Sequence, residues 1–222
     1  LDEPTAVLSP PEVGEAEREL LLAAFETHDV KRYVLGPPDI LPITPGETPK
    51  LALDREGWRD ESHPFTMTSL PQDRALEFTI KSYPEHDGVT VRLDDLEPGD
   101  TVLLSDPFDT YSYRGPGVFL AGGAGITPFL CILRDLARKG EAREQHLIFS
   151  NKTPRDVICE KELRHLLGDR FVSTCTQESG PGHDDRRIDR AYLEERLAGV
   201  ETRRFYICGP PGFTKALKQV AA

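Results

Sequence analysis

The chain has 222 residues and a mass of 24.8 kDa, which allows one large domain or two of about 110 residues. Apolar residues make up 38% and charged residues 29%, an ordinary globular composition that excludes a disordered chain. The net charge of −11 argues against nucleic acid as the main partner, because neutralising phosphates takes a surplus of Lys and Arg. No apolar run approaches the roughly 18 residues of a membrane span, and the sequence contains no secretory signal pattern, so we expect a cytoplasmic protein.

Four cysteines stand 28, 16 and 33 residues apart, at Cys131, Cys159, Cys175 and Cys208. No CxxC or Cx4C pair exists among them, which excludes a zinc ribbon and a plant-type iron–sulfur cluster. We therefore predict free thiols in a reducing compartment and no metal site.

The first half of the chain predicts short strands separated by turns. Between Ala75 and Lys81 the sequence alternates, which places Leu76, Phe78 and Ile80 on one face of a strand. Prolines recur about every ten residues, which suits the corners of an antiparallel barrel rather than long central strands. Further strands are predicted over residues 30–35, 51–53 and 101–104.

The second half predicts alternating strands and helices, and therefore a parallel sheet with helices on its faces. Strands are predicted over 118–121, 145–150, 171–175 and 204–208. Helices are predicted over 129–136 and 160–167, from an N-cap at Asp189 to Leu197, and from near Gly212.

These patterns predict two domains, a barrel over residues 1–114 and an α/β domain over residues 115–222. Residues 1–19 form an extension of the barrel without a clear pattern. Residues 11–24 fit a helix, whereas residues 20–27 equally fit the first barrel strand.

The most informative stretch is residues 117–128, Gly-Val-Phe-Leu-Ala-Gly-Gly-Ala-Gly-Ile-Thr-Pro. A buried strand leads into Gly122, Gly123 and Gly125, and a helix follows with Thr127 and Pro128 at its start. Glycines let the backbone approach a ligand and a helix N-terminus offers free N–H groups, so the stretch predicts a phosphate site. The spacing differs from GxGxxG, and a tight turn that needs glycine only for packing is the alternative.

A second motif spans residues 205–212, Phe-Tyr-Ile-Cys-Gly-Pro-Pro-Gly. Its strand ends at Cys208, at the carboxyl edge of the parallel sheet, where open α/β sheets bind ligands. Gly209, Pro210 and Pro211 follow as a stiff loop that lacks two N–H donors. Cys208 is therefore a better site candidate than the other three cysteines.

A third stretch, residues 63–69, reads His-Pro-Phe-Thr-Met-Thr-Ser. Followed in order by Gly88-Val-Thr90, the glycine stretch and Cys208-Gly-Pro-Pro211, it resembles the ferredoxin–NADP reductase family. The similarity is greatest to the short bacterial flavodoxin reductases and NAD(P)H-dependent flavin oxidoreductases, and it covers the chain from about residue 20. It implies a Greek-key β-barrel that binds FAD rather than FMN, an α/β domain that binds NAD(P), and a flavin-dependent oxidoreductase.

The resemblance also implies residue roles in the flavin site. The family holds its flavin with an Arg-x-Tyr-Ser/Thr stretch, and here Phe65 replaces the tyrosine that packs on the flavin. Thr66 keeps the hydroxyl that hydrogen-bonds near flavin N5. His63, before Pro64, occupies the position of the family's arginine, which binds the flavin phosphates. An imidazole lacks the permanent charge and the two parallel N–H donors of a guanidinium.

Two further segments resemble parts of the family's flavin site: a turn that opens a helix against the pyrophosphate, and a strand end that lines the flavin. The first is Gly88, Val89 and Thr90, and the second is Lys81, Ser82 and Tyr83. The alternatives are a simple capped turn and solvated residues at the barrel edge.

The glycine loop implies the NAD(P) pyrophosphate site, and Cys208 implies the residue beside the nicotinamide. Thr66 and Cys208 are then catalytic by orienting and polarising, because the flavin itself carries the redox chemistry. Residues 174–178 follow the third α/β strand and read Thr-Cys-Thr-Gln-Glu, neutral then acidic, which favours NADH over NADPH. Residues 151–155, or Arg186 and Arg187, are alternative sources of positive charge for a 2′-phosphate.

The resemblance implies a separate, soluble electron acceptor such as flavodoxin, ferredoxin or an oxygenase component. The alternatives are an NADH-dependent reductase of free flavin, an electron-transfer subunit without independent turnover, and a nucleotide-binding protein with a degenerate flavin site. The sequence stops one short helix after Cys208-Gly-Pro-Pro211, so we expect no terminal aromatic over the flavin and a face open to small acceptors.

Overall fold

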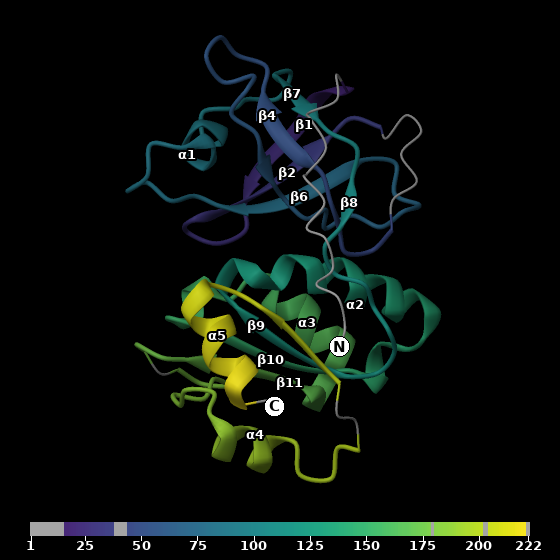
Figure 1. Ribbon diagram of the computed structural model, residues 1–222, viewed down its shortest axis with the longest axis vertical. Coiled ribbons are helices and arrows are strands. Elements are labelled where there is room, and N and C mark those ends of the chain that lie inside the picture. The colour runs from purple at the N-terminus through teal and green to yellow at the C-terminus, as the bar shows by residue number, and fades with distance from the viewer. Residues whose placement is uncertain (1–15, 38–43, 179, 202–203, 221–222) are drawn as a thin grey trace, which may run out of the picture.

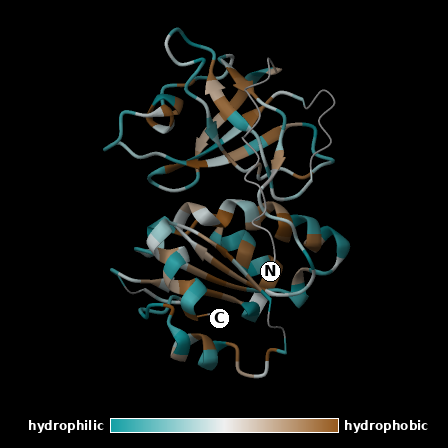
Figure 2. Cartoon of the chain, viewed as in Figure 1, coloured by the Kyte–Doolittle hydropathy of each residue, from teal (hydrophilic) through white to brown (hydrophobic). Residues whose placement is uncertain are grey.

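The computed structural model describes residues 16–37, 44–178, 180–201 and 204–220. The chain forms two bodies stacked along the long axis, an antiparallel barrel and an α/β sheet with helices on both faces (Figure 1). Both halves gather hydrophobic residues on their strands, while hydrophilic residues lie on loops and outer helix faces (Figure 2). No helix in these described ranges is long and apolar enough to cross a membrane.

The barrel is built from one six-stranded antiparallel sheet in the order β5-β4-β7-β1-β2-β6, with β3 pairing to β8 beside it. A bridge between Met67 and Phe78 joins the segment after β5 to β6, so the two edges of the sheet approach each other. The elements are β1 (Ala16–Phe25), β2 (Val30–Leu35), β3 (Glu47–Thr48), β4 (Lys50–Leu53), β5 (His63–Pro64), β6 (Leu76–Lys81), α1 (Val89–Leu93), β7 (Thr101–Leu104) and β8 (Phe108–Asp109).

The core of the barrel confirms the period-two pattern. Leu76, Phe78 and Ile80 of β6 are each at most 4% exposed and join one apolar cluster with residues of β2, β4 and β7. From residue 16 onward, β1 is the strand rather than the helix that residues 11–24 also fitted. Residues 1–15 lie outside the described part of the chain.

The second half is a four-stranded parallel sheet in the order β11-β10-β9-β12. This architecture confirms the predicted α/β fold. Its elements are β9 (Val118–Gly122), the 3₁₀ turn η1 (Gly123–Ile126), α2 (Thr127–Lys139), η2 (Ala142–Glu144), β10 (His146–Asn151), η3 (Pro154–Asp156), α3 (Glu160–Leu167), η4 (Gly168–Arg170), β11 (Phe171–Cys175), α4 (Arg190–Arg196), β12 (Phe205–Cys208) and α5 (Pro211–Val220).

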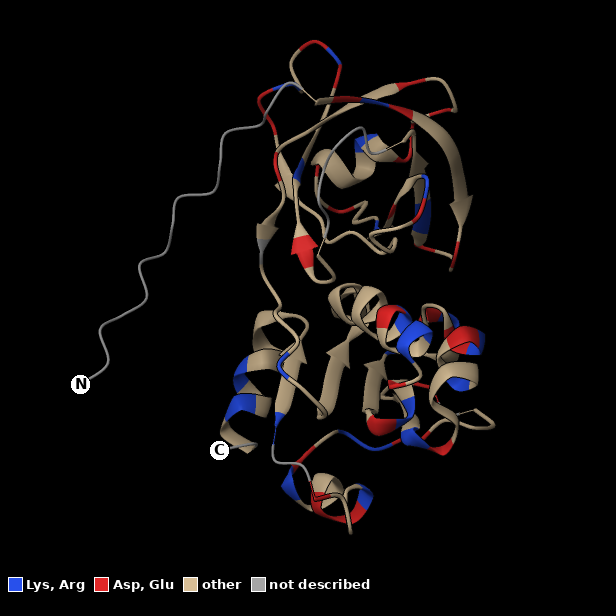
Figure 3. Ribbon diagram, turned by 90° about the vertical axis from the view of Figure 1, so that its right-hand side faces the viewer, with Lys and Arg blue, Asp and Glu red and all other residues tan. Residues whose placement is uncertain are grey.

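The central strand β9 is buried on both sides because successive side chains point to opposite faces. Phe119 packs in the cluster beneath α2 and α3, whereas Val118 and Leu120 pack in the cluster beneath α4 and α5. The strands of this sheet carry no Lys, Arg, Asp or Glu, which lie on the surrounding helices and loops (Figure 3).

Two helix starts show how local sequence sets the ends of elements. The Asp189 carboxylate accepts from the backbone N–H of Tyr192 at 2.8 Å, which confirms the predicted cap of α4. Helix α5 begins at Pro211, which confirms the predicted start near Gly212, and proline suits the first helical position, where no N–H partner is needed. The stiff loop before α5 is therefore only Gly209 and Pro210.

The barrel and the α/β half are tied together through α2. Arg134 Nη1 donates to the Thr68 carbonyl at 2.6 Å and to Glu77 Oε1 at 2.7 Å, and both acceptors belong to the barrel. Its Nε and Nη2 donate to Glu162 of α3 at 2.7 and 2.9 Å. One helical turn earlier, the Cys131 thiol donates to the Ser69 carbonyl at 2.9 Å.

Candidate functional site

A pocket of about 310 Å³ opens between the two halves at the carboxyl ends of β9 and β10. The chain leaves β9 toward β10 on one side, and β12 lies on the other, so this is the switch point at which open α/β sheets bind ligands. Val30, Lys81 and Tyr83 line the pocket from the barrel. The opposite side is formed by the glycine loop, the end of β10, Pro210 and Phe213.

The sequence left two reasons for the glycines in this loop, tight packing and close approach of a ligand. The structure shows each reason at different glycines. At Gly125, a Cβ would lie 2.5 Å from the Cys208 carbonyl oxygen, and at Gly122 it would lie 3.1 Å from the Phe213 ring, so packing requires glycine there. Gly123 has φ +52, and a Cβ there would have no neighbour within 4 Å, so this residue borders open space in the pocket wall.

The helical turn that begins at Gly123 has unpaired backbone N–H groups beside the pocket. Turn η1 runs directly into α2, so the first unpaired N–H groups belong to residues 123–125. The Thr127 hydroxyl donates to the Ala124 carbonyl at 3.1 Å, and Pro128 is buried in the first turn of α2. Both residues shape the loop, and a phosphate at this end of the helix would meet the positive end of its dipole.

Cys208 lies at the end of β12, directly against the glycine loop, so the structure brings together two motifs that are far apart in the sequence. Burial raises the pKa of its thiol, which keeps the sulfur protonated at neutral pH. The Tyr111 hydroxyl contacts the thiol and donates to the Ile207 carbonyl at 3.0 Å. A protonated thiol is a poor nucleophile, so the raised pKa argues against nucleophilic chemistry at Cys208.

Asn151 begins the 151–155 stretch, which the sequence offered only as a source of positive charge, so its amide was not anticipated as a site group. It ends β10, lines the pocket and is only 6% exposed, yet neither polar atom of its amide has a hydrogen-bond partner among the described residues. Buried amides are normally paired, so this side chain fits a ligand that offers both a donor and an acceptor. A nicotinamide dinucleotide offers both on its carboxamide, ribose and adenine groups.

The His-Pro-Phe-Thr stretch lies on and just after β5. His63 and Pro64 are exposed, and Phe65 is partly buried against the barrel core. Thr66 is half-buried, and its hydroxyl lies 3.0 Å from the hydroxyl of Thr48. The exposed position of His63 would let its imidazole contact a phosphate at the protein surface.

The strand end after β6 has one paired and one unpaired polar group. Lys81 binds the Asp29 carboxylate at 2.5 Å. Burial raises the pKa of Asp29, but the hydrogen bond and charge of Lys81 outweigh it and hold that pKa below its usual range. The Ser82 hydroxyl is buried without a partner in the described chain, as a residue lining a cofactor would be, whereas Tyr83 is exposed and stacks on His86.

The Gly88-Val-Thr turn opens a helix as the sequence predicted. Gly88 is the N-cap of α1, Val89 is buried and Thr90 is half-buried. A Cβ at Gly88 would have no neighbour within 4 Å, so the glycine faces open space that a ligand could fill. The open space at Gly88 and the unpartnered Ser82 hydroxyl are two features that a bound cofactor would fill and pair.

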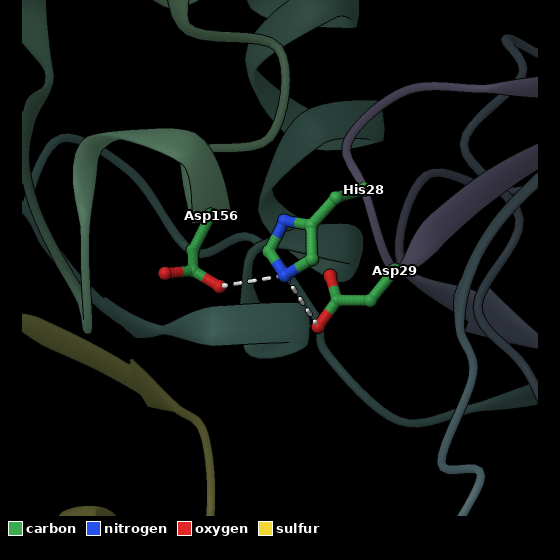
Figure 4. Close-up of side chains that lie close together, drawn as sticks. All are labelled: His28, Asp29 and Asp156. Atoms are coloured by element: carbon green, nitrogen blue, oxygen red, sulfur yellow. Dashed lines mark ion pairs between the residues drawn. The ribbon is translucent and has the colours of Figure 1, made fainter.

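A histidine and two carboxylates meet at the rim of an adjoining pocket of about 410 Å³ (Figure 4). His28 Nε2 lies 3.6 Å from Asp29 Oδ2 and 3.9 Å from Asp156 Oδ1, which joins the β1–β2 loop to η3. Both carboxylates already have partners: Lys81 binds Asp29, and the backbone N–H and hydroxyl of Thr153 donate to Asp156 at 2.8 and 2.7 Å. The cluster is therefore a contact between the halves.

The same adjoining pocket bears on the choice between NADH and NADPH. Lys152 and Arg155 line it, and so does Glu178, the acidic residue after β11. Arg186 is committed elsewhere, because it binds Glu195 at 2.7 Å and stacks on a tyrosine ring. Of the basic groups that the sequence offered for a 2′-phosphate, only those of residues 151–155 border this pocket.

A family model described as the oxidoreductase NAD-binding domain matches residues 119–219. The chain is 29% identical to the ferredoxin–NAD(P)+ reductase component of the naphthalene 1,2-dioxygenase/salicylate 5-hydroxylase systems of a Ralstonia species, over 88% of this chain and 61% of that protein. It is also 29% identical to NADH-cytochrome b5 reductase 1 of Candida glabrata, over 92% of this chain and 78% of that protein. The chain spans about three fifths of the length of the dioxygenase-system reductases that it matches.

Among solved structures, a ferredoxin NADP+ reductase from Neisseria gonorrhoeae with bound FAD and NADP superimposes with a TM-score of 0.79. The match covers 92% of this chain and 89% of that one at 23% identity, so it shows the fold. Residues 119–219 thus match the oxidoreductase NAD-binding domain model, and the chain as a whole has the fold of that ferredoxin NADP+ reductase.

Proposed function

We propose that the chain is an NAD(P)H-dependent flavoprotein reductase. It binds FAD on the barrel and a nicotinamide dinucleotide on the α/β half, and it passes electrons to a separate acceptor such as a ferredoxin, a flavodoxin or an oxygenase component. The observation that carries this proposal is the pocket between the halves, where the glycine loop and the unpaired Asn151 amide face the barrel and Cys208 packs against the glycine loop.

The bound flavin would supply the redox chemistry by accepting a hydride and releasing electrons. The residues of the chain supply binding and orientation. Backbone N–H groups of residues 123–125 hold pyrophosphate, Asn151 donates to and accepts from the dinucleotide, and Cys208 sets the position of the nicotinamide ring. On the barrel, the flavin ring is contacted by Phe65 and Thr66 and lined by Ser82. The FAD pyrophosphate is held by the turn at Gly88 and Thr90.

We further propose NADH as the preferred donor. A 2′-phosphate in the adjoining pocket would meet the carboxylates of Glu178 and Asp156, and repulsion between like charges opposes its binding. Lys152 and Arg155 partly offset this repulsion, so the preference is expected to be modest.

The domain boundary is proposed to lie near residue 114, in the connection between β8 and β9, with the flavin-binding domain over 1–114 and the NAD(P)-binding domain over 115–222. All four cysteines are free, which supports a cytoplasmic, reducing location. Similarity to reductase components of oxygenase systems supports a ferredoxin or an oxygenase component as the acceptor.

The test of this function is to saturate the purified chain with FAD, remove free cofactor and record its visible absorbance before and after NADH under anaerobic conditions. We expect one FAD per chain and bleaching on addition of NADH. A chain that retains no flavin, or retains flavin that NADH leaves oxidised, contradicts the proposed function.

A further inference from the structure

Three threonine hydroxyls form a chain that ends at Thr66. Thr66 Oγ1 lies 3.0 Å from Thr48 Oγ1, and Thr48 Oγ1 lies 2.6 Å from Thr110 Oγ1. Thr110 Oγ1 in turn donates to the Gly46 carbonyl at 2.8 Å. The pairing of β3 with β8 brings residues 48 and 110 together, and Thr66 reaches them from the segment after β5.

The carbonyl at the far end fixes the direction of every hydrogen bond in this chain. A carbonyl oxygen only accepts, so Thr110 uses its single hydroxyl hydrogen on Gly46. Thr48 must then donate to Thr110, and Thr66 must donate to Thr48. Thr66 consequently has no hydrogen left for a ligand, and it presents only lone pairs.

The fold holds the carbonyl end and the middle of this hydroxyl chain, at Gly46 and Thr48. Gly46 has φ +98, and a Cβ there would overlap the carbonyl oxygen of Tyr111, so the turn that aims the Gly46 carbonyl requires glycine. Thr48 is 3% exposed, so water does not compete for its hydroxyl hydrogen. The direction of the chain is therefore built in before any ligand binds.

We propose that Thr48 and Thr110 are positioning residues that turn Thr66 into a hydrogen-bond acceptor only, and thereby favour reduced over oxidised flavin. This inference rests on the proposed function, in which Thr66 lies beside flavin N5. In oxidised flavin, N5 carries a lone pair, which an acceptor-only hydroxyl opposes unfavourably. In reduced flavin, N5 carries a hydrogen, and the same hydroxyl accepts a hydrogen bond from it.

The test is the midpoint potential of FAD bound to the full chain, measured by spectroscopic titration against a reference dye. Thr110→Val removes the acceptor of Thr48, which frees Thr48 to donate to Thr66 and Thr66 to donate to the cofactor. We expect the affinity of the chain for oxidised FAD, relative to reduced FAD, to rise about tenfold. This change lowers the two-electron midpoint potential by about 30 mV.

Three further variants separate this effect from a loss of packing. Thr48→Val breaks the chain one step nearer Thr66 and should lower the potential in the same direction, whereas Thr110→Ser keeps the hydroxyl and the wild-type potential. Thr79→Val is the control for lost packing, because it deletes a fully buried threonine contact of the barrel, 3.2 Å to Thr68, with no link to Thr66. Its potential should equal that of the wild type.

A potential that stays at the wild-type value in both Thr110→Val and Thr48→Val, with FAD bound, overturns the inference alone. A drop of equal size in Thr79→Val also overturns it, because the effect would then follow from packing. If the wild-type chain binds no flavin, the proposed function fails and this inference fails with it.

Discussion

Replacing Arg134 by methionine should destabilise the protein by about 3 kcal/mol, because it removes the nearest cation of two carboxylates. The Arg134 side chain is 18% exposed, and it binds Glu77 of the barrel and Glu162 of α3 while also donating to the Thr68 carbonyl. Removing one partner of a buried ion pair costs roughly 3–5 kcal/mol, and we expect the lower end because Glu162 is 35% exposed.

The assay is urea unfolding followed by circular dichroism, with Lys139→Met as the matched control on the same helix. Lys139 binds Asp135 four residues earlier and is 57% exposed, so its removal should cost less than about 0.5 kcal/mol. Met fills much of the volume of the arginine stem, so lost packing contributes little. A free energy of unfolding for Arg134→Met within about 1 kcal/mol of the wild type would refute this account of the contact, because ordinary substitutions cost that much.

The destabilisation should also depend on pH. Burial raises the pKa of Glu162, but the hydrogen bond and charge of Arg134 outweigh it and hold that pKa below its usual range. A carboxyl of this kind stabilises the folded state above its unfolded pKa of about 4.3, and the contribution is lost as the pH falls through the folded value. The difference between wild type and Arg134→Met should therefore be larger at neutral pH than at a pH below the unfolded value, and an unchanged difference would contradict the assignment.

Three other substitutions test the site itself. Asn151→Leu should raise the KM for NADH about tenfold, because the lost amide bonds are worth about 1–3 kcal/mol, and leave FAD affinity unchanged; equal KM values in steady-state assays would exclude Asn151 from the dinucleotide site. Cys208→Ala should slow flavin reduction in stopped-flow experiments by about tenfold without altering the flavin spectrum, and an unchanged rate would remove the thiol from the nicotinamide site. Glu178→Lys should raise kcat/KM for NADPH relative to NADH about tenfold, whereas the same change at the remote Glu194 should not; equal ratios in both would place the 2′-phosphate elsewhere.

Most of the secondary structure could be predicted from the sequence because local pattern determines it. The alternation around Phe78, the apolar run at 118–121 and the cap at Asp189 each depend on neighbours within one element, and each is confirmed. The start of α5 at Pro211 likewise agrees with the predicted start near Gly212, because proline fits the first helical position.

The polar contacts between segments could not be predicted in this way. Arg134, Tyr111 and Asn151 belong to no motif, and their roles appear only when the fold brings distant segments together. Tyr111 reaches Ile207 across 96 residues, and Arg134 reaches Thr68 across 66. An unpaired buried amide is likewise invisible in a sequence, since pairing is a property of the folded environment.

The central claim, that this chain carries a hydride from a nicotinamide dinucleotide to a flavin it binds, is tested most directly by stopped-flow mixing of the FAD-loaded chain with NADH in the absence of oxygen. The account predicts that the flavin absorbance bleaches in a single turnover, at a rate that saturates with NADH and falls when the transferred hydrogen is deuterium. Flavin that stays oxidised in the presence of excess NADH, or bleaching at a rate no different from that of free FAD, would contradict it.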